Sequence, residues 1–284
     1  MQIQGSGLGN FSSTAIVDTS CDAQHGRLWV NDADGLAIAK EEIANTSFIH
    51  KFGNAPNFDQ ADGIVSIWDG SDDDGIDEIS YTYSTTNDID SITSTSSTDT
   101  QVVEVQGLDE DFIPVTQEVT ITGSGYTEIG TPLMRVFRIK NQGATDNTGN
   151  VCVYVSGPTT AGVPDTTTDI RACMGSGNNQ TLMAIYTVPK GRTGYLDNWY
   201  ASTAGATRTS SYVVDLRIRP SGGIFQLKHR SALEDAGTSH IQHDYNVPEV
   251  IQAMSDVEMR VRATTNNITD ASVSAGFDIT LVDQ

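Results

Sequence analysis

Hydrophobic and polar residues alternate with a period of two along much of the chain, and this pattern predicts β-strands with one buried face. In residues 212–220 every second position from 214 is aliphatic and the positions between are charged, and residues 256–263 repeat the pattern. A Ser-Gly-Gly turn at 221–223 indicates a hairpin with a strand at 224–230. Further strands are expected at 76–83, 101–106, 115–122, 133–140, 151–155, 180–188 and 273–282.

One segment favours a helix. Residues 34–45 begin with Asp34, which can cap a helix, and carry a weak apolar stripe. Residues 1–20 are rich in Gly, Ser and Thr and predict an extended arm. Between the strands lie Gly, Asn and Asp clusters and no helical pattern. We therefore expect an all-β protein: an antiparallel β-sandwich or jelly-roll-like body with an extended N-terminal arm and one short helix.

Charge is distributed unevenly. The 284 residues include 16 Lys and Arg against 37 Asp and Glu, a formal net charge of −21. Residues 52–134 contain 17 acidic residues and no Lys or Arg, whereas residues 135–284 contain 14 acidic and 13 basic residues. This boundary favours three parts: an anchoring arm and helix at 1–50, an acidic β region at 51–134 and a C-terminal β-sandwich domain at 135–284. One interleaved sandwich over 51–284 is the alternative.

The acidic balance and the absence of apolar runs limit the partners. A surface with this charge repels a phosphate backbone, so no nucleic-acid partner is expected. The first residues have neither the cationic nor the apolar region of a signal peptide, and no stretch approaches the roughly 18 apolar residues of a membrane-spanning helix. We expect synthesis in a cytoplasm and no membrane partner.

The residues offer no catalytic constellation. No G-x-S-x-G motif occurs, and His240 and His243, three positions apart, lie in a segment expected to be a loop or a short strand. We expect no enzymatic activity and no cofactor. The aromatic residues Trp68, Tyr81, Tyr83, Trp199 and Tyr200 are expected to pack in a core or an interface, with a sugar-binding face as the alternative.

An acidic turn is the best candidate for a cation site. It contains Asp69, Asp72, Asp73 and Asp74, and carboxylate oxygens of this kind suit calcium. The spacing does not match the EF-hand template, because Gly70 stands where the first ligand should be. We expect a solvated acidic turn, with a structural calcium site as the alternative.

The three cysteines, Cys21, Cys152 and Cys173, include no C-x-x-C pair, and an odd number does not suggest a secreted disulfide framework. Cys152 and Cys173 lie in apolar segments and are expected to be buried as small hydrophobic residues. A bridge between these two is the alternative.

Basic residues alternate outward on three predicted strands. They are Arg217, Arg219, Lys228, Arg230, Arg260 and Arg262. If the strands are neighbours, these side chains form a basic stripe. We expect these side chains to be ordinary solvent-facing strand residues that also protect the sheet edges from pairing with other chains. The alternative is a surface that binds acidic groups on another copy of the chain or on a partner shell.

Three segments resemble a family of virion structural proteins of marine and cyanobacterial tailed phages. They are IHKFGNAPNFDQADGIVSIWDG at 49–70, NQTLMAIYTVPKGRTGYLDNWYAS at 179–202 and DVEMRVRATTNNITDASVSAGFDITLVDQ at 256–284. Members of this family are capsid-decoration, cement or head-fibre proteins. The resemblance implies an all-β protein without catalytic chemistry, present in many copies on the particle.

The most specific hypothesis is a capsid-associated cement or decoration protein on the virion surface. Its partners would be the major capsid protein and copies of itself, as a homotrimer. A tail, neck or fibre-base component is one alternative, and a lectin-like host-recognition module is another.

Overall fold

The computed structural model describes residues 30–71, 80–204, 210–235, 238–264 and 271–284. The chain divides into two compact units, residues 1–48 and residues 49–284. The arm expected at 1–20 lies outside the described residues. No helix of the described part is long and apolar enough to cross a membrane.

Among its described residues, the first unit has one short helix, α2 (Val30–Ala39), followed by the start of strand β1 (Thr46–Phe58). The helix begins four residues before Asp34 and ends six residues before Asn45, so the helix expected at 34–45 is displaced toward the N-terminus. Its end has a local cause: Glu41 and Asn45 both have positive φ, 59° and 60°, a backbone conformation that cannot continue a right-handed helix.

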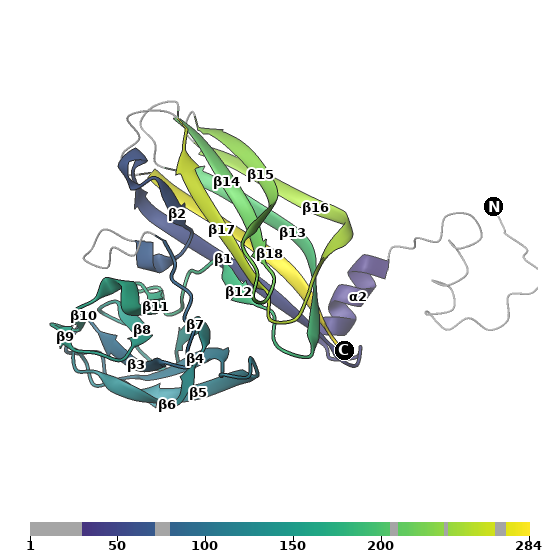
Figure 1. The fold of residues 1–284 in the computed structure, drawn as a ribbon. Coiled ribbons are helices and arrows are strands. Elements are labelled where there is room, and N and C mark those ends of the chain that lie inside the picture. The colour runs from purple at the N-terminus through teal and green to yellow at the C-terminus, as the bar shows by residue number, and fades with distance from the viewer. Residues whose placement is uncertain (1–29, 72–79, 205–209, 236–237, 265–270) are drawn as a thin grey trace, which may run out of the picture. The chain divides into compact units, whose positions relative to one another are not determined.

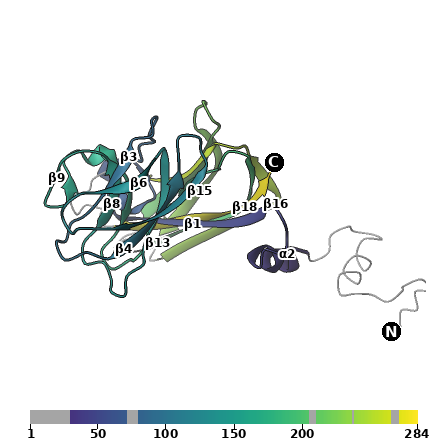
Figure 2. The same cartoon turned by 90° about the horizontal axis from the view of Figure 1, so that it is seen from below.

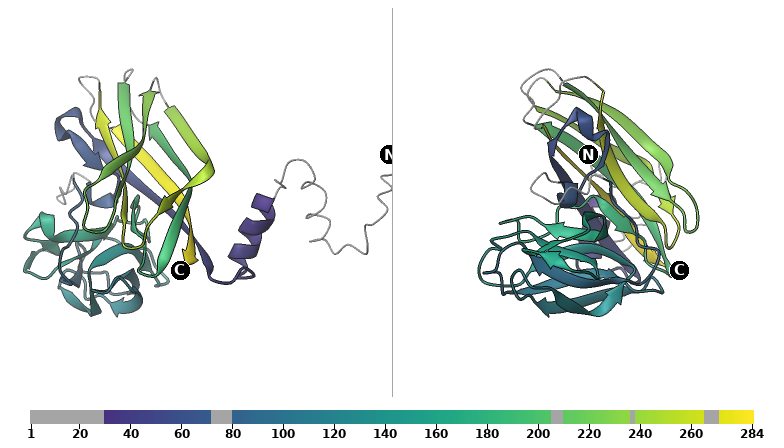
Figure 3. Two further views of the ribbon diagram at one scale, coloured as in Figure 1. Left: turned by 45° about the vertical axis from the view of Figure 1, so that its right-hand side comes forward. Right: turned by 60° about the vertical axis from the view of Figure 1, so that its left-hand side comes forward.

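The second unit is all-β, as expected, and is built from two antiparallel sandwiches. In the first sandwich one sheet has the order β1-β18-β13-β16 and the other has the order β12-β17-β14-β15, with β2 also paired to β17 (Figures 1 and 3). Its strands are β1, β2 (Ile64–Ser66), β12 (Ile185–Thr187), β13 (Arg192–Ala204), β14 (Ser210–Arg219), β15 (Gln226–Asp235), β16 (Thr238–Ile251), β17 (Asp256–Ala263) and β18 (Ala271–Asp283).

The second sandwich is inserted between β2 and β12. Its sheets have the orders β11-β8-β3-β6 and β5-β4-β7, and Figure 2 shows β3, β6 and β8 side by side. Its strands are β3 (Ile89–Ser94), β4 (Val102–Leu108), β5 (Pro114–Thr120), β6 (Thr127–Leu133), β7 (Arg135–Asn141), β8 (Val151–Val155) and β11 (Ile170–Met174), with a small hairpin β9 (Thr159–Thr160) and β10 (Val163–Pro164). Short 3₁₀ turns are η1 (Gln60–Asp62), η2 (Asp69–Ser71) and η3 (Thr167–Asp169).

Each sandwich has its own hydrophobic core, and alternation decides which residues enter it. Val214, Met259 and Phe277 are fully buried between the two sheets of the first sandwich. Leu133 and Ile139 are fully buried in the second. Because successive side chains of a strand point to opposite faces, the predicted period of two places these residues inward.

The charge boundary between residues 134 and 135 does not coincide with a boundary between the cores. Leu133 on β6 and Val136 on β7 lie on opposite sides of it and pack in the same core. Most residues of the second core lie between 81 and 183, and the first core is formed by the segments that flank this range. Net charge depends on exposed positions and core membership depends on buried ones, so the two can change at different places along a chain.

The segments that connect the sandwiches contribute to both cores in alternation. Ile67 packs in the first core and Trp68 in the second. On the return, Ala184 packs in the first core, whereas Met183 and Ile185 pack in the second. Of the strand expected at 180–188, therefore, only β12 forms, and of the strand expected at 76–83 the described residues 80–83 do not belong to a strand.

Candidate functional site

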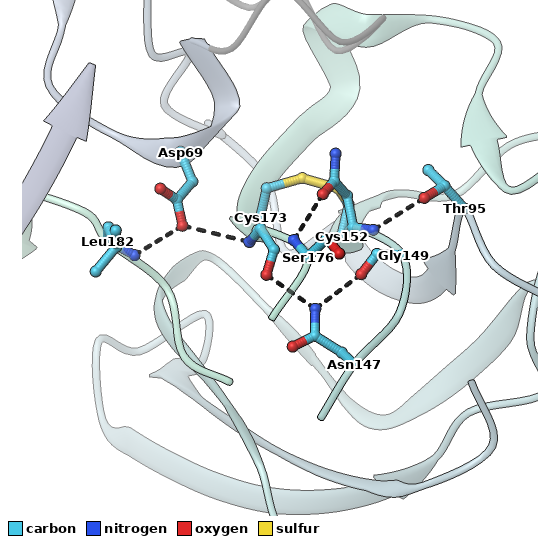
Figure 4. The surroundings of a disulfide bond; sticks show 10 residues. Asp69, Thr95, Asn147, Gly149, Cys152, Cys173, Ser176 and Leu182 are labelled. Atoms are coloured by element: carbon cyan, nitrogen blue, oxygen red, sulfur yellow. Dashed lines mark hydrogen bonds between the residues drawn. A yellow bond between two sulfur atoms is a disulfide. The ribbon is translucent and has the colours of Figure 1, made fainter. Parts of the chain in front are cut away.

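The acidic turn is tied to the protein backbone through Asp69. Its side chain is largely buried, and Oδ2 accepts the backbone N–H of Leu182 at 3.0 Å and that of Gly175 at 3.4 Å (Figure 4). This carboxylate therefore joins η2 to the loop that follows β11. The other calcium candidates, Asp72, Asp73 and Asp74, lie outside the described residues. Among the residues that the structure describes, no three His, Cys, Asp or Glu side chains converge on a metal position.

Cys152 and Cys173 are buried, as expected, and they are also bonded to each other. They lie directly opposite on the antiparallel pair β8 and β11, with Cα atoms 4.2 Å apart. The neighbouring loops are held by Asn147, whose Nδ2 donates to the carbonyls of Gly149 and Gly175 at 2.7 and 2.9 Å (Figure 4). The bridge thus fastens one end of the second sandwich.

The six basic residues of the predicted stripe come from three adjacent strands in the order β15-β14-β17. Arg217 and Arg219 lie on β14, Lys228 and Arg230 on β15, and Arg260 and Arg262 on β17. The register places acidic residues between them: Arg230 is opposite Asp215, which is opposite Arg260. Arg217 is likewise opposite Glu258. The sheet face is therefore a grid of alternating charges.

Most of these cations form ion pairs within the chain. Arg230 binds Asp215 with two hydrogen bonds, Nε–Oδ1 at 2.6 Å and Nη2–Oδ2 at 2.8 Å, a bidentate geometry. Lys228 Nζ lies 2.7 Å from Glu249 Oε1 of β16. Arg260 Nε lies 2.5 Å from Oε1 of Glu258, which is fully buried. Their charges are compensated before any partner binds, and the role of the six residues in partner binding stays a prediction.

Asp256 is the centre of a buried polar cluster that could not be recognised from the sequence. Its buried carboxylate accepts hydrogen bonds from Arg219 Nε at 2.8 Å, from Arg135 Nε at 3.0 Å and from Thr187 Oγ1 at 2.6 Å. Arg135 belongs to the second sandwich and the other three residues belong to the first. One carboxylate therefore connects the two sandwiches.

An aromatic ring covers the two arginines of this cluster. The guanidinium carbons of Arg219 and Arg135 lie 4.4 and 5.2 Å from the ring centre of Tyr83, within the range of a cation–π interaction. Burial, then Glu258 and Asp256, raise the pKa of Tyr83 well above its ordinary value, so its hydroxyl stays neutral. A hollow of about 370 Å³ borders the cluster, and its lining includes Arg135, Arg219 and Asp256.

Two histidine rings contact each other at the side of the first sandwich. His229 on β15 and His243 on β16 have ring centres 4.3 Å apart, and the Trp199 ring lies 4.9 Å from that of His229. Burial, then the neighbouring His243, lower the pKa of His229 below its ordinary 6.5. His240 and His243, considered together from the sequence, both lie on β16, where an interval of three puts them on opposite faces.

A second hollow lies on the outward face of the sheet β1-β18-β13-β16. Its volume is about 420 Å³ and its lining includes His50, Phe52, Asn54, Tyr200 and Ser274. Of the five aromatic residues considered for a sugar-binding face, Tyr200 is the one in this lining. Trp68, Tyr81 and Trp199 are buried in the cores, and Tyr83 packs on the arginines.

His50 is held in position by hydrogen bonds on both sides of its ring. Nδ1 lies 2.6 Å from Oδ1 of Asp278, and Nε2 lies 3.4 Å from the hydroxyl of Tyr200. The Asp278 carboxylate also accepts a hydrogen bond from Nδ2 of Asn198 at 2.8 Å. Burial, then Asp278, raise the pKa of Tyr200 to about 12, so its hydroxyl can donate at neutral pH.

Sequence and structure comparisons leave the family of the chain undefined. No protein-family model matches it, and no curated protein matches it. Solved structures that resemble it include the VP2 subviral particle of infectious bursal disease virus, with 10% identity over 85% of this chain and 73% of that chain and a TM-score of 0.23. The structure of the Gt strain of the same virus has 10% identity over 84% of this chain and 73% of that chain, with a TM-score of 0.21. The structure of the Gx strain has 9% identity over 84% of this chain and 76% of that chain, with a TM-score of 0.20. TM-scores this low do not decide the function.

Proposed function

We propose that this chain is a structural protein of a tailed-phage virion, and most specifically a cement or decoration protein on the capsid surface. The observation that carries the proposal is where the three segments resembling phage virion proteins lie. In sequence they are separated by about a hundred residues and by fifty. In the structure they belong to one sandwich.

The three segments form adjacent strands in both sheets of that sandwich. Segments 49–70, 256–284 and 179–202 contribute β1, β18 and β13, which are consecutive in one sheet. The same segments contribute β2, β17 and β12, which are joined through β17 in the other sheet. The three resembling segments thus form neighbouring strands of one sandwich. A resemblance confined to one packed sandwich supports common ancestry better than a resemblance scattered over surface loops.

Physical properties of the second unit also suit a surface that carries many copies. The whole chain has a net charge of −21, and like charges keep neighbouring copies apart outside their intended contacts. The two sandwiches are joined by the buried ion pair of Arg135 with Asp256 and by shared core segments. Such a body can be attached through a separate anchor, and in this proposal residues 1–48 bind the major capsid protein.

Among the six basic residues, Arg262 and Arg217 are the better candidates for contacts with acidic groups of a partner or of another copy in a trimer. Arg217 stacks on Phe225 with its guanidinium carbon 4.6 Å from the ring centre. Nε of Arg262 is buried and donates no hydrogen bond to the described part of the chain. The remaining four form the internal ion pairs described above.

Quantitative mass spectrometry of purified particles tests the proposal. The measured quantity is the number of copies of this chain per copy of the major capsid protein, with a tail protein of known copy number as the internal control. A ratio near one, or near one third, supports a cement or decoration protein. A ratio below about one in thirty supports the tail, neck or fibre-base alternative, and absence from particles refutes a virion role.

The anchor is tested separately by reconstitution. Particles that lack the protein are mixed with the full chain or with a chain that lacks residues 1–48, and bound protein is measured after sedimentation. Binding by the full chain alone supports anchoring by the first unit. Equal binding by both chains would show that the anchor lies in residues 49–284.

A further inference from the structure

The outward face of the sheet β1-β18-β13-β16 has a different chemical character from the rest of the first sandwich. Its centre carries aromatic, amide and hydroxyl side chains, whereas the outward face of the other sheet carries the grid of charged residues. The residues that matter here are His50, Phe52, Asn54, Tyr200, Ser274 and Asp278. They come from three consecutive strands, so the sheet hydrogen bonds fix their positions.

The floor of the hollow includes the ring of Tyr200, whose hydroxyl end packs over a glycine. Tyr200 on β13 is directly opposite Gly276 on β18. A Cβ atom at Gly276 would lie 2.3 Å from the Tyr200 hydroxyl and 2.4 Å from the carbonyl of Lys51, so only glycine leaves room for the ring to lie there.

Two further rings border this floor. The imidazole of His50 is nearly parallel to the Tyr200 ring, at 19° with ring centres 6.1 Å apart. Phe52, two residues along β1, lies 5.5 Å from His50. An apolar surface formed by three fixed rings suits a ligand that has a flat face of C–H groups.

Polar groups at the margin are oriented by neighbouring side chains. Asp278 fixes His50, as described above. Asn54 Oδ1 accepts the hydroxyls of Ser274 at 2.8 Å and Ser272 at 3.0 Å. Both hydroxyls therefore occupy the amide oxygen of Asn54 as an acceptor. Its Nδ2 has no hydrogen-bond partner among the described residues and can donate to a ligand. Groups that are fixed before binding lose little conformational entropy when a ligand arrives.

We propose that this hollow binds a neutral hexopyranose unit of a glycan. One face of a pyranose ring carries C–H groups that stack on Tyr200, and its equatorial hydroxyls can accept a hydrogen bond from Nδ2 of Asn54 and donate one to the hydroxyl oxygen of Ser274. The volume of about 420 Å³ lies within the range of small-ligand sites. An acidic sugar is disfavoured, because the described lining contains no Lys or Arg and the chain carries a charge of −21.

This site goes beyond the structural role proposed above and does not depend on it. A decoration protein with a glycan site would bring the particle to a polysaccharide surface. A tail protein with the same site would do so at another place on the particle. The binding test therefore succeeds or fails independently of the copy-number measurement.

Saturation-transfer difference NMR on the full chain tests the inference. The probes are D-glucose, D-galactose, D-mannose and N-acetyl-D-glucosamine, with D-glucuronic acid as the acidic comparison, each at about 10 mM so that a Kd near 1 mM is detected. We expect transfer to at least one neutral sugar, strongest at the protons of one ring face, and little transfer to glucuronic acid.

Variants locate the site. Ser274→Trp fills the hollow and leaves Tyr200 and Gly276 in place, and Asn54→Ala removes the oriented amide; both should abolish or strongly reduce transfer. Tyr126→Ala removes a tyrosine that is 59% exposed on the second sandwich and should leave transfer unchanged. Circular dichroism confirms that each variant is folded. The inference is overturned if the folded wild-type chain shows no transfer to any neutral sugar, if it prefers glucuronic acid, or if Ser274→Trp retains full transfer.

Discussion

The guanidinium Nε of Arg135 lies 3.0 Å from Oδ1 of Asp256, although the two residues are 121 positions apart and belong to different sandwiches. Both side chains are almost completely buried, with 9% and 4% exposed. Arg219 shares the same carboxylate, so one acid binds two guanidinium groups. A connection of this kind depends on every partner being present, since each remaining charge would otherwise be buried without compensation.

Replacing Asp256 with alanine should therefore destabilise the protein strongly. The substitution leaves Arg135 buried without its carboxylate, and breaking a buried pair in this way costs about 3–5 kcal/mol. The measurement is the free energy of unfolding in urea. The matched control is Asp283→Ala, which removes a partly exposed pair with Arg192 and should cost less than about 1 kcal/mol.

A second measurement separates loss of the connection from general unfolding. If Asp256 joins the sandwiches, Asp256→Ala should let the second sandwich be cleaved by protease at its connecting segments before the first sandwich unfolds. Equal losses of stability in Asp256→Ala and Asp283→Ala would contradict the assigned role.

The disulfide should contribute measurably to the stability of the second sandwich. Cys152 and Cys173 are 21 positions apart, and closing a loop of about this length stabilises a protein by roughly 3 kcal/mol in the chain-entropy model. We expect reductant to lower the Tm of the wild-type chain. A Cys152→Ala, Cys173→Ala double variant should have a lower Tm from the start and should not respond to reductant. A wild-type Tm that reductant leaves unchanged would speak against the bond.

The strands of the first sandwich were predictable because their two faces meet different environments. On β14 the aliphatic residues Val214, Leu216 and Ile218 face the core, and the residues between them lie on the outward face. One buried face and one outward face produce a period of two, which a single sequence reveals.

The connecting segments were not predictable in this way. Ile67 and Trp68 are successive residues and both are fully buried, because they enter different cores. A segment with two apolar environments has no polar face, so its sequence does not distinguish a paired strand from an extended link. The second sandwich is inserted between β2 and β12, and both of these strands pair with β17. The alternation of residues within one segment does not show which distant strand that segment pairs with.

The ion pairs and the hollow were hidden for another reason. His50 and Asp278 are 228 positions apart and meet because β1 pairs with β18. The alternation on β14 showed that Arg217 and Arg219 share a face, but the acids opposite them lie on β17, whose adjacency is not encoded locally. Candidate residues were therefore identifiable one strand at a time, and their partners were not.

The two contacting histidines predict a loss of stability in weak acid. The pKa of His229 is lowered in the folded protein, so between the unfolded value near 6.5 and the lower folded value the unfolded chain binds more protons. Stability contributed by neutral His229 is thus present above pH 6.5 and lost as the pH falls below it. The measurement is the urea midpoint at pH 7.5 and 5.5. A His229→Phe variant should show a smaller decrease than the wild type, and an identical decrease would exclude His229 as the cause.

Asp99 should produce a second, more acidic transition. Its buried carboxylate accepts the Ser94 hydroxyl at 2.7 Å and the backbone N–H groups of Thr148 and Gly149 at 2.9 and 3.0 Å. Burial by itself raises the pKa of Asp99, but these donors outweigh it and hold the pKa below the ordinary 3.8.

The carboxylate form of Asp99 is the form that the fold stabilises, because the folded pKa is the lower one. The contribution of Asp99 is present above the unfolded pKa near 3.8 and is lost as the pH falls through the lower folded value. Asp99→Asn keeps the shape and removes the charge, so it should lower the free energy of unfolding at pH 7 by about 1–3 kcal/mol. The difference from wild type should shrink when both are measured at about pH 2.5, where the wild-type carboxylate also begins to be protonated. A difference that stays constant from pH 7 to pH 2.5 would mean that packing, and not the charged hydrogen bonds, is what the substitution disturbs.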